Sequence, residues 1–161
     1  GKSTWAVLAL TLDVELFTQL HYRQSIDPDA ELSELFKDVF LYHWREESQH
    51  AILDELAWVR VDAGLTAEHR DCAVDEFIEL VAAVDGILRI QAKADAGYFA
   101  AKCGRGVDEA EARVIEAVFL KAYRWQYIHS GAQHPQFRKV LSSLITGNQG
   151  QRIQAALATL Q

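Results

Sequence analysis

Apolar residues recur at spacings of three and four along most of this chain, which is the period of an amphipathic α-helix. The strict alternation of apolar and polar residues that is typical of a strand is scarce. The 161 residues include only two prolines, Pro28 and Pro135, so few helices are expected to be broken internally. The sequence therefore predicts an all-α protein, folded as a single domain over residues 1–161.

Local signals divide the chain into four long helices and two short ones. Asp27-Pro28 is interpreted as a cap followed by a first-turn proline, Thr66 and Asp108 as further starts, and Gly104-Arg105-Gly106 as a stop. Gly147-Asn148-Gln149-Gly150 is expected to form the last connection. The expected helices cover residues 4–25, 28–62, 66–103, 108–130, 136–145 and 151–160.

Long helices on short connections pack antiparallel. We therefore expect a four-helix bundle over about 4–130 and a C-terminal helical appendage over about 135–161. Two of the long helices also resemble each other. Residues 39–50 align with residues 118–129 at an offset of 79, with five identities in twelve positions, and both segments end on a histidine. This internal repeat predicts a bundle made of two related helical hairpins.

The charge balance disfavours two classes of partner. The formal net charge is −7 at pH 7, whereas a nucleic acid or an anionic membrane surface would attract a basic face. No apolar run reaches the ~18 residues of a membrane span. The two cysteines, Cys72 and Cys103, point away from a disulfide scaffold. We therefore expect a soluble, cytoplasmic protein that binds neither nucleic acid nor membrane.

Glu47 and His50 form a Glu-x-x-His pair, the clearest chemical signal in the chain. On a helix their side chains lie about 60° apart and one turn displaced, so both can reach a single cation. An isolated pair of this kind has a simple alternative, a surface glutamate beside a solvated histidine. Glu15 favours the metal site, because it lies in an otherwise apolar stretch where a carboxylate is costly without a partner.

The internal repeat extends the candidate site to the second hairpin. Asp95 precedes Gln126 by 31 residues, much as Glu15 precedes Glu47 by 32, and His129 aligns with His50. Because Gln126 is neutral and a poor bridging group, a degenerate second half without a metal role is the alternative. The candidate metal ligands are Glu15, Glu47, His50, Asp95, Gln126 and His129.

His43 stands four residues before Glu47 on the same helical face and is the candidate for an additional ligand. Its alternative role is a histidine that packs beside Trp44 and is hydrogen-bonded nearby. Asp54 continues the face and could accept a hydrogen bond from a ligand histidine. Four other polar residues are interpreted as solvated or capping groups: Asp13, Glu46, Glu55 and His69.

The combination of Glu15 with Glu47-x-x-His50 on long helices resembles the ferritin-like superfamily of carboxylate-bridged dinuclear metal proteins. The extra His43 resembles a variation seen in di-iron arylamine N-oxygenases of that superfamily. Asp95 and Gln126 depart from the family pattern, which has glutamate at both positions.

The resemblance implies one or two iron or manganese ions and an oxidase or oxygenase that uses dioxygen on a small-molecule substrate. A competing hypothesis is a non-catalytic helical scaffold or interaction protein with a degenerate metal site. The sequence is thus compatible both with a di-iron oxidoreductase or oxygenase and with a protein that is not an enzyme. A homodimer is the predicted assembly.

Overall fold

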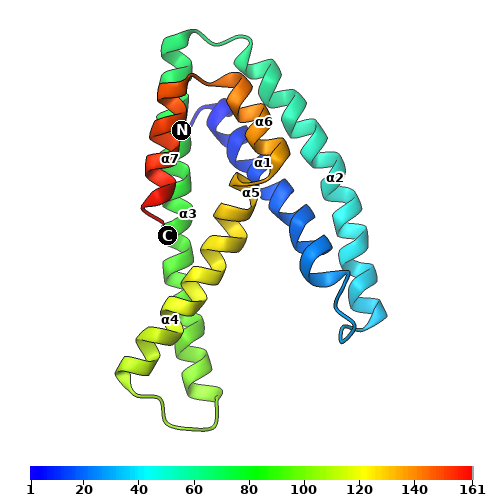
Figure 1. Cartoon of the computed structure of the whole chain (residues 1–161), viewed down its shortest axis with the longest axis vertical. Helices are drawn as coiled ribbons and strands as arrows, with labels where there is room; N and C mark the ends of the chain where they lie inside the picture. Colours follow the sequence, from blue (N-terminus) through cyan, green and yellow to red (C-terminus); the bar gives the residue numbers. More distant parts are fainter. Residues whose placement is uncertain (161) are drawn as a thin grey trace.

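The computed structural model describes residues 1–160, and over these residues the chain is helical throughout, without a strand (Figure 1). The all-α prediction is confirmed. Two helices, α1 and α4, each continue into a π-helical turn. The elements are α1 (Thr4–His21), η1 (Tyr22–Ile26), α2 (Glu34–Asp62), α3 (Ala67–Lys102), α4 (Glu109–Arg124), η2 (Trp125–His129), α5 (Ser130–Ala132), α6 (Pro135–Leu144) and α7 (Gly147–Ala158).

The start of α2 differs from the sequence prediction. Thr66 and Asp108 cap α3 and α4 as expected, but α2 begins at Glu34 instead of next to Pro28. The hydroxyl of Ser33 accepts a hydrogen bond from the Phe36 N–H at 3.3 Å, which makes Ser33 the cap. Asp27 and Pro28 belong to the turn between η1 and α2.

The start of α7 is a second correction. Gly147 to Gly150 form its first turn, whereas the sequence predicted a connection there. Thr146 and Gln149 make a capping box: the Gln149 N–H donates to the Thr146 hydroxyl at 3.3 Å, and the Thr146 N–H donates to the Gln149 side chain at 2.8 Å. These two hydrogen bonds outweigh the low helix propensity of the glycines.

The four long helices form two hairpins that meet along part of their length. Helix α1 packs on α2 and on α3, α3 packs on α4, and α2 and α4 make at most marginal contact. In Figure 1 the α1–α2 and α3–α4 hairpins lie close together in the upper half of the view and diverge toward the bottom. The hairpin pairing is as the repeat predicted, while a closed four-helix bundle stays a prediction.

The two hairpins cross where α5 lies against α1. A Cβ atom on Gly131 would lie 2.4 Å from the backbone oxygen of Asp13 and 2.6 Å from its carboxylate oxygen, so only glycine fits. The interpretation of Asp13 as a solvated group is wrong. Its side chain is only 5% exposed, because this crossing covers it, and burial raises the pKa of its carboxyl well above the ordinary value.

The main core lies at the end of the molecule where α1 begins and α2 ends. The indoles of Trp5 and Trp58 meet edge to face with centroids 5.1 Å apart, and Phe137 of α6 stacks on Trp58 at 5.8 Å. The Trp5 indole N–H donates to buried Asp62 at 2.9 Å, and Asp62 pairs with Arg70. The C-terminal segment is therefore part of the core and holds α1, α2 and α3 together.

The chain exposes more surface than its size requires. Its accessible area is 9995 Å², whereas a compact monomer of the same mass would expose about 8,100 Å². Large apolar side chains contribute to this surface, among them Leu35, Tyr42 and Ile90. Among the described helices, none combines the length and the hydropathy that crossing a lipid bilayer requires.

Candidate metal centre

Three of the predicted ligands come together between α1 and α2. Glu15 lies on α1, and Glu47 and His50 lie one turn apart on α2; their ligand atoms are all within 4.8 Å of one another. Next to them, the Ser48 hydroxyl donates to the Gln19 amide oxygen at 2.7 Å, which ties the two helices together. The antiparallel packing of α1 on α2 thus forms the cluster that the sequence pattern indicated.

Glu47 is the centre of this cluster. One of its carboxylate oxygens lies 2.8 Å from Nδ1 of His50, and the other lies 3.0 Å from Nδ1 of His43. His43 therefore contacts the candidate site directly, while the neighbouring Trp44 ring packs on Tyr22 at 5.5 Å. Glu15 and Glu47 are partly buried, and both histidines are exposed at the edge.

The two carboxyl groups of the cluster have opposite pKa shifts. Burial, together with the hydrogen bond and negative charge of Glu47, raises the pKa of Glu15 to about 8. The hydrogen bond with Glu15, helped by His50, lowers the pKa of Glu47. The hydrogen bond with Glu47 raises the pKa of His50. Without a metal ion, the pair of carboxyl groups thus retains a proton that a bound cation would displace.

Asp95 and His129, two candidate ligands of the second half, are not part of this cluster. The Tyr123 hydroxyl donates to the Asp95 carboxylate at 2.5 Å, and the Gln91 amide donates to it at 2.8 Å. These hydrogen bonds lower the pKa of Asp95 and raise the pKa of Tyr123 to about 12. The His129 ring lies 3.3 Å from the carbonyl oxygen of Leu160.

The π-helical turn η2 explains why the repeat in the sequence does not produce a repeat in the geometry. Gln126 and His129 both lie in η2, where the hydrogen bonds span five residues instead of four. The wider turn rotates residues three apart away from each other, whereas Glu47 and His50 share a face of a regular α-helix. The hydrogen bond between Tyr123 and Asp95 was also not predicted from the sequence. The repeat aligns Tyr123 with Trp44, which gives no indication of a carboxylate partner.

A buried ion pair near η2 fixes the second hairpin. The Arg124 guanidinium donates to Asp85 at 2.6 and 3.0 Å, and Arg89 donates to the same carboxylate at 2.7 Å. Both partners of the Arg124–Asp85 pair are buried. This pair holds α3 against α4. Among residues 1–160, Asp85 does not belong to a cluster of possible metal ligands.

Comparison with protein-family models, with curated proteins and with solved structures found no match to this chain. The functional argument therefore depends on the donor set itself. Two carboxylates and one imidazole, with a second imidazole in contact with Glu47, are ligands suited to iron or manganese.

Proposed function

We propose that this chain is a metal-binding protein of the ferritin-like class, in which Glu15, Glu47 and His50 bind a transition metal ion between α1 and α2. The observation that carries the proposal is the convergence of these three side chains from two helices, with their ligand atoms within 4.8 Å of one another. Iron is the first candidate and manganese the second, because mixed imidazole and carboxylate ligands suit both.

The residues of the site support one tightly bound ion instead of two. Glu15 and Glu47 would supply the negative charge, His50 a neutral nitrogen, and His43 lies in contact with Glu47 as a further donor. The second ion of a dinuclear centre would depend on Asp95, Gln126 and His129. Asp95 is instead hydrogen-bonded within its own hairpin, and His129 lies next to Leu160.

The activity that we propose is oxidation of a small molecule with dioxygen. A bound iron ion would supply the redox chemistry, and the exposed edge formed by His43 and His50 would leave the ion accessible to dioxygen and substrate. A non-catalytic helical scaffold is the second candidate, favoured by the internal hydrogen bonds of Asp95. Oxygen consumption by the Fe(II)-loaded protein separates the two candidates.

Metal titration tests the site. In protein stripped by a chelator, anaerobic Fe(II) or Mn(II) should bind with one tight equivalent per chain, measured by calorimetry. Glu47→Gln and His50→Ala should abolish this step, because each removes a ligand of the cluster. His69→Ala is the matched control, since His69 is exposed at the start of α3. His129→Ala should leave the tight step intact.

Two results would contradict this assignment. Absence of stoichiometric metal binding in the stripped native protein would rule out the metal site and leave the scaffold. Two equally tight equivalents, both lost in His50→Ala and His129→Ala, would restore a conventional dinuclear centre.

We also propose that a second copy of the chain packs along α2. The face of α2 opposite to α1 carries an apolar stripe of side chains that are 59–76% exposed, interrupted by Glu46 and Gln49. The stripe consists of Leu35, Val39, Tyr42, Leu53 and Leu56.

An antiparallel pairing of two α2 helices, centred between Glu46 and Gln49, matches this stripe with itself. It would place Val39 of one copy against Leu56 of the other, and Tyr42 against Leu53, at the three-and-four spacing of a coiled coil. The surface of the monomer exceeds that of a compact chain by about 1,900 Å², more than the ~800 Å² that each partner buries in a standard interface.

A further inference from the structure

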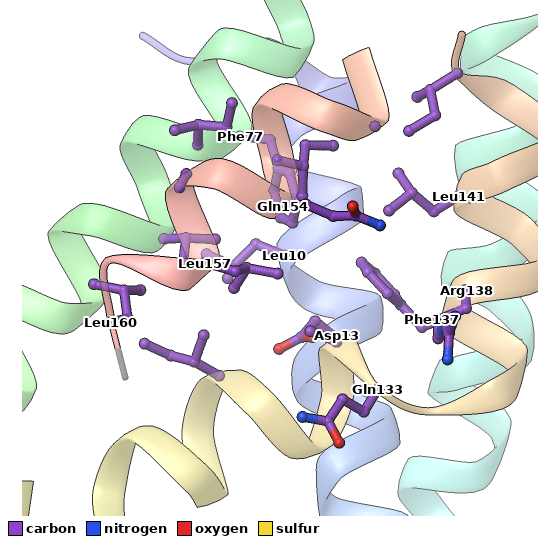
Figure 2. A pocket seen from close by; sticks show the side chains of 18 of the residues that line it. Leu10, Asp13, Phe77, Gln133, Phe137, Arg138, Leu141, Gln154, Leu157 and Leu160 are labelled. Atoms are coloured by element: carbon purple, nitrogen blue, oxygen red, sulfur yellow. The ribbon is translucent and has the colours of Figure 1, made fainter. Parts of the chain in front are cut away.

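A cavity of about 730 Å³ lies on the side of α1 that faces away from α2, between α1, α3, α6 and α7 (Figure 2). Its walls are mainly apolar, and its volume falls within the ~300–1,000 Å³ that is usual for small-molecule sites. Figure 2 shows Leu10 of α1, Phe137 of α6 and Leu157 of α7 around the same space. The apolar walls include Leu10, Phe77, Val81, Phe137, Leu141 and Leu157.

A buried carboxyl group lies at one end of this cavity. Asp13 is 5% exposed, lines the cavity and points into it in Figure 2. Within residues 1–160, no protein group donates a hydrogen bond to its carboxyl, whose oxygens are not among the fully enclosed atoms and so reach the cavity. A buried polar group without a partner is costly and uncommon in proteins. Asp13 is therefore the polar group that a bound molecule would satisfy.

The cavity is separate from the candidate metal centre. None of Glu15, Glu47 and His50 lines it. Residues two apart on a helix point about 200° apart, so Asp13 and Glu15 lie on opposite faces of α1. Binding of a molecule in the cavity therefore does not depend on metal binding at Glu15, Glu47 and His50.

We propose that this cavity binds an apolar molecule that carries one basic nitrogen, with the nitrogen donating a hydrogen bond to the Asp13 carboxylate. A basic nitrogen supplies both the donor that the carboxyl group lacks and the positive charge that compensates it. The rest of the molecule fills the apolar walls. An anionic head group at this end would supply neither a hydrogen-bond donor nor a compensating positive charge. Arg138 and Lys139 also line the cavity but are exposed to water.

Three probes with the same alkyl chain test this inference in the native protein: octylamine, octanol and octanoate. Calorimetric titration in buffer of about 0.15 M ionic strength limits non-specific attraction to the net charge of −7. Octylamine should bind with one equivalent, about tenfold more tightly than octanol. The reason is that its ammonium group pairs with the Asp13 carboxylate at a site that is largely shielded from water. Octanoate should bind more weakly than octanol.

Two matched variants place the effect at Asp13. Asp13→Asn should weaken octylamine binding about tenfold and leave octanol binding within about twofold, since the charge alone is removed. Asp38→Asn changes the net charge by the same amount at an exposed position of α2. It should change neither the affinity for octylamine nor the affinity for octanol. The inference is overturned if octylamine binds no more tightly than octanol, if octanoate binds most tightly, or if Asp13→Asn leaves octylamine binding unchanged.

Discussion

Glu15 makes the stability of the metal-free protein depend on pH. Its carboxyl has a pKa of about 8 in the folded chain and an ordinary value of 4.5, so the folded state retains a proton that the unfolded state loses between these values. Stability should therefore fall as pH rises from 4.5 through 8. Glu15→Gln imitates the protonated form, and it should melt a few degrees above the native protein at pH 9.

The measurement is thermal unfolding by circular dichroism in the presence of a chelator, at pH 4.5 and pH 9. The native protein and Glu15→Gln should melt alike at pH 4.5, where Glu15 is protonated in the folded state. A difference between the two proteins that is equal at both pH values would contradict the assignment of this titration to Glu15.

Gly131 is the residue on which the crossing of the hairpins depends. In Gly131→Ala the new methyl group would meet the backbone of Asp13 at 2.4 Å, so α5 and α1 would have to separate. We expect a loss of about 1–3 kcal/mol in the free energy of unfolding, measured by urea denaturation.

Gly97→Ala is the control for this substitution. Gly97 lies within α3, and a Cβ there would have no neighbour within 4 Å. It should stabilise the protein by about 0.5–1 kcal/mol, because alanine favours a helix over glycine. Equal effects of the two substitutions would mean that contact with Asp13 is unimportant.

The sequence predicted side-chain positions well where they depend on one helix and its partner in the same hairpin. Glu47 and His50 share a face because they are three residues apart, and Glu15 lies on α1, which packs on α2. The burial of Asp13 was not predictable in this way. It depends on α5, more than a hundred residues further along the chain, and on the absence of a side chain at Gly131.

At the scale of helices, the start of α2 is set by Ser33. Ser33→Ala removes the hydroxyl that accepts the Phe36 N–H, and we expect a loss of about 1 kcal/mol in the free energy of unfolding. Pro28→Ala should have little effect, because Pro28 lies in an exposed turn before the helix. Chemical denaturation of both variants tests this; a larger loss in Pro28→Ala would place the helix start earlier.

Helix ends were predictable when the cap is a single side chain, as at Thr66 and Asp108. They were not predictable when two residues act together, as in the capping box that carries α7 through two glycines. Nor does the spacing of apolar residues show where an α-helix widens into η2. That widening changes the direction of His129, and with it the second half of the candidate site.

For the whole molecule, size-exclusion chromatography with light scattering tests the proposed pairing along α2. The native protein should have twice the monomer mass of 18.1 kDa, and Leu53→Glu should return it to the monomer mass, because a charge would be buried against the second copy. Ile90→Glu places the same charge at a position of α3 that is 73% exposed, outside the stripe, and should leave the dimer intact. A native protein that elutes as a monomer at all concentrations would contradict the pairing.

The divergence of the two hairpins has a consequence for how the fold opens. The tightest packing is at one end, around Trp5 and Trp58, while the loop after α3 lies at the far end in Figure 1. Segments with few buried contacts open at a low free energy, without unfolding of the rest. Amide protons near Phe77 in α3 should therefore exchange with solvent only on global unfolding, whereas those near Lys102 should exchange through local fraying. A single helix would thus carry a gradient of protection along its length.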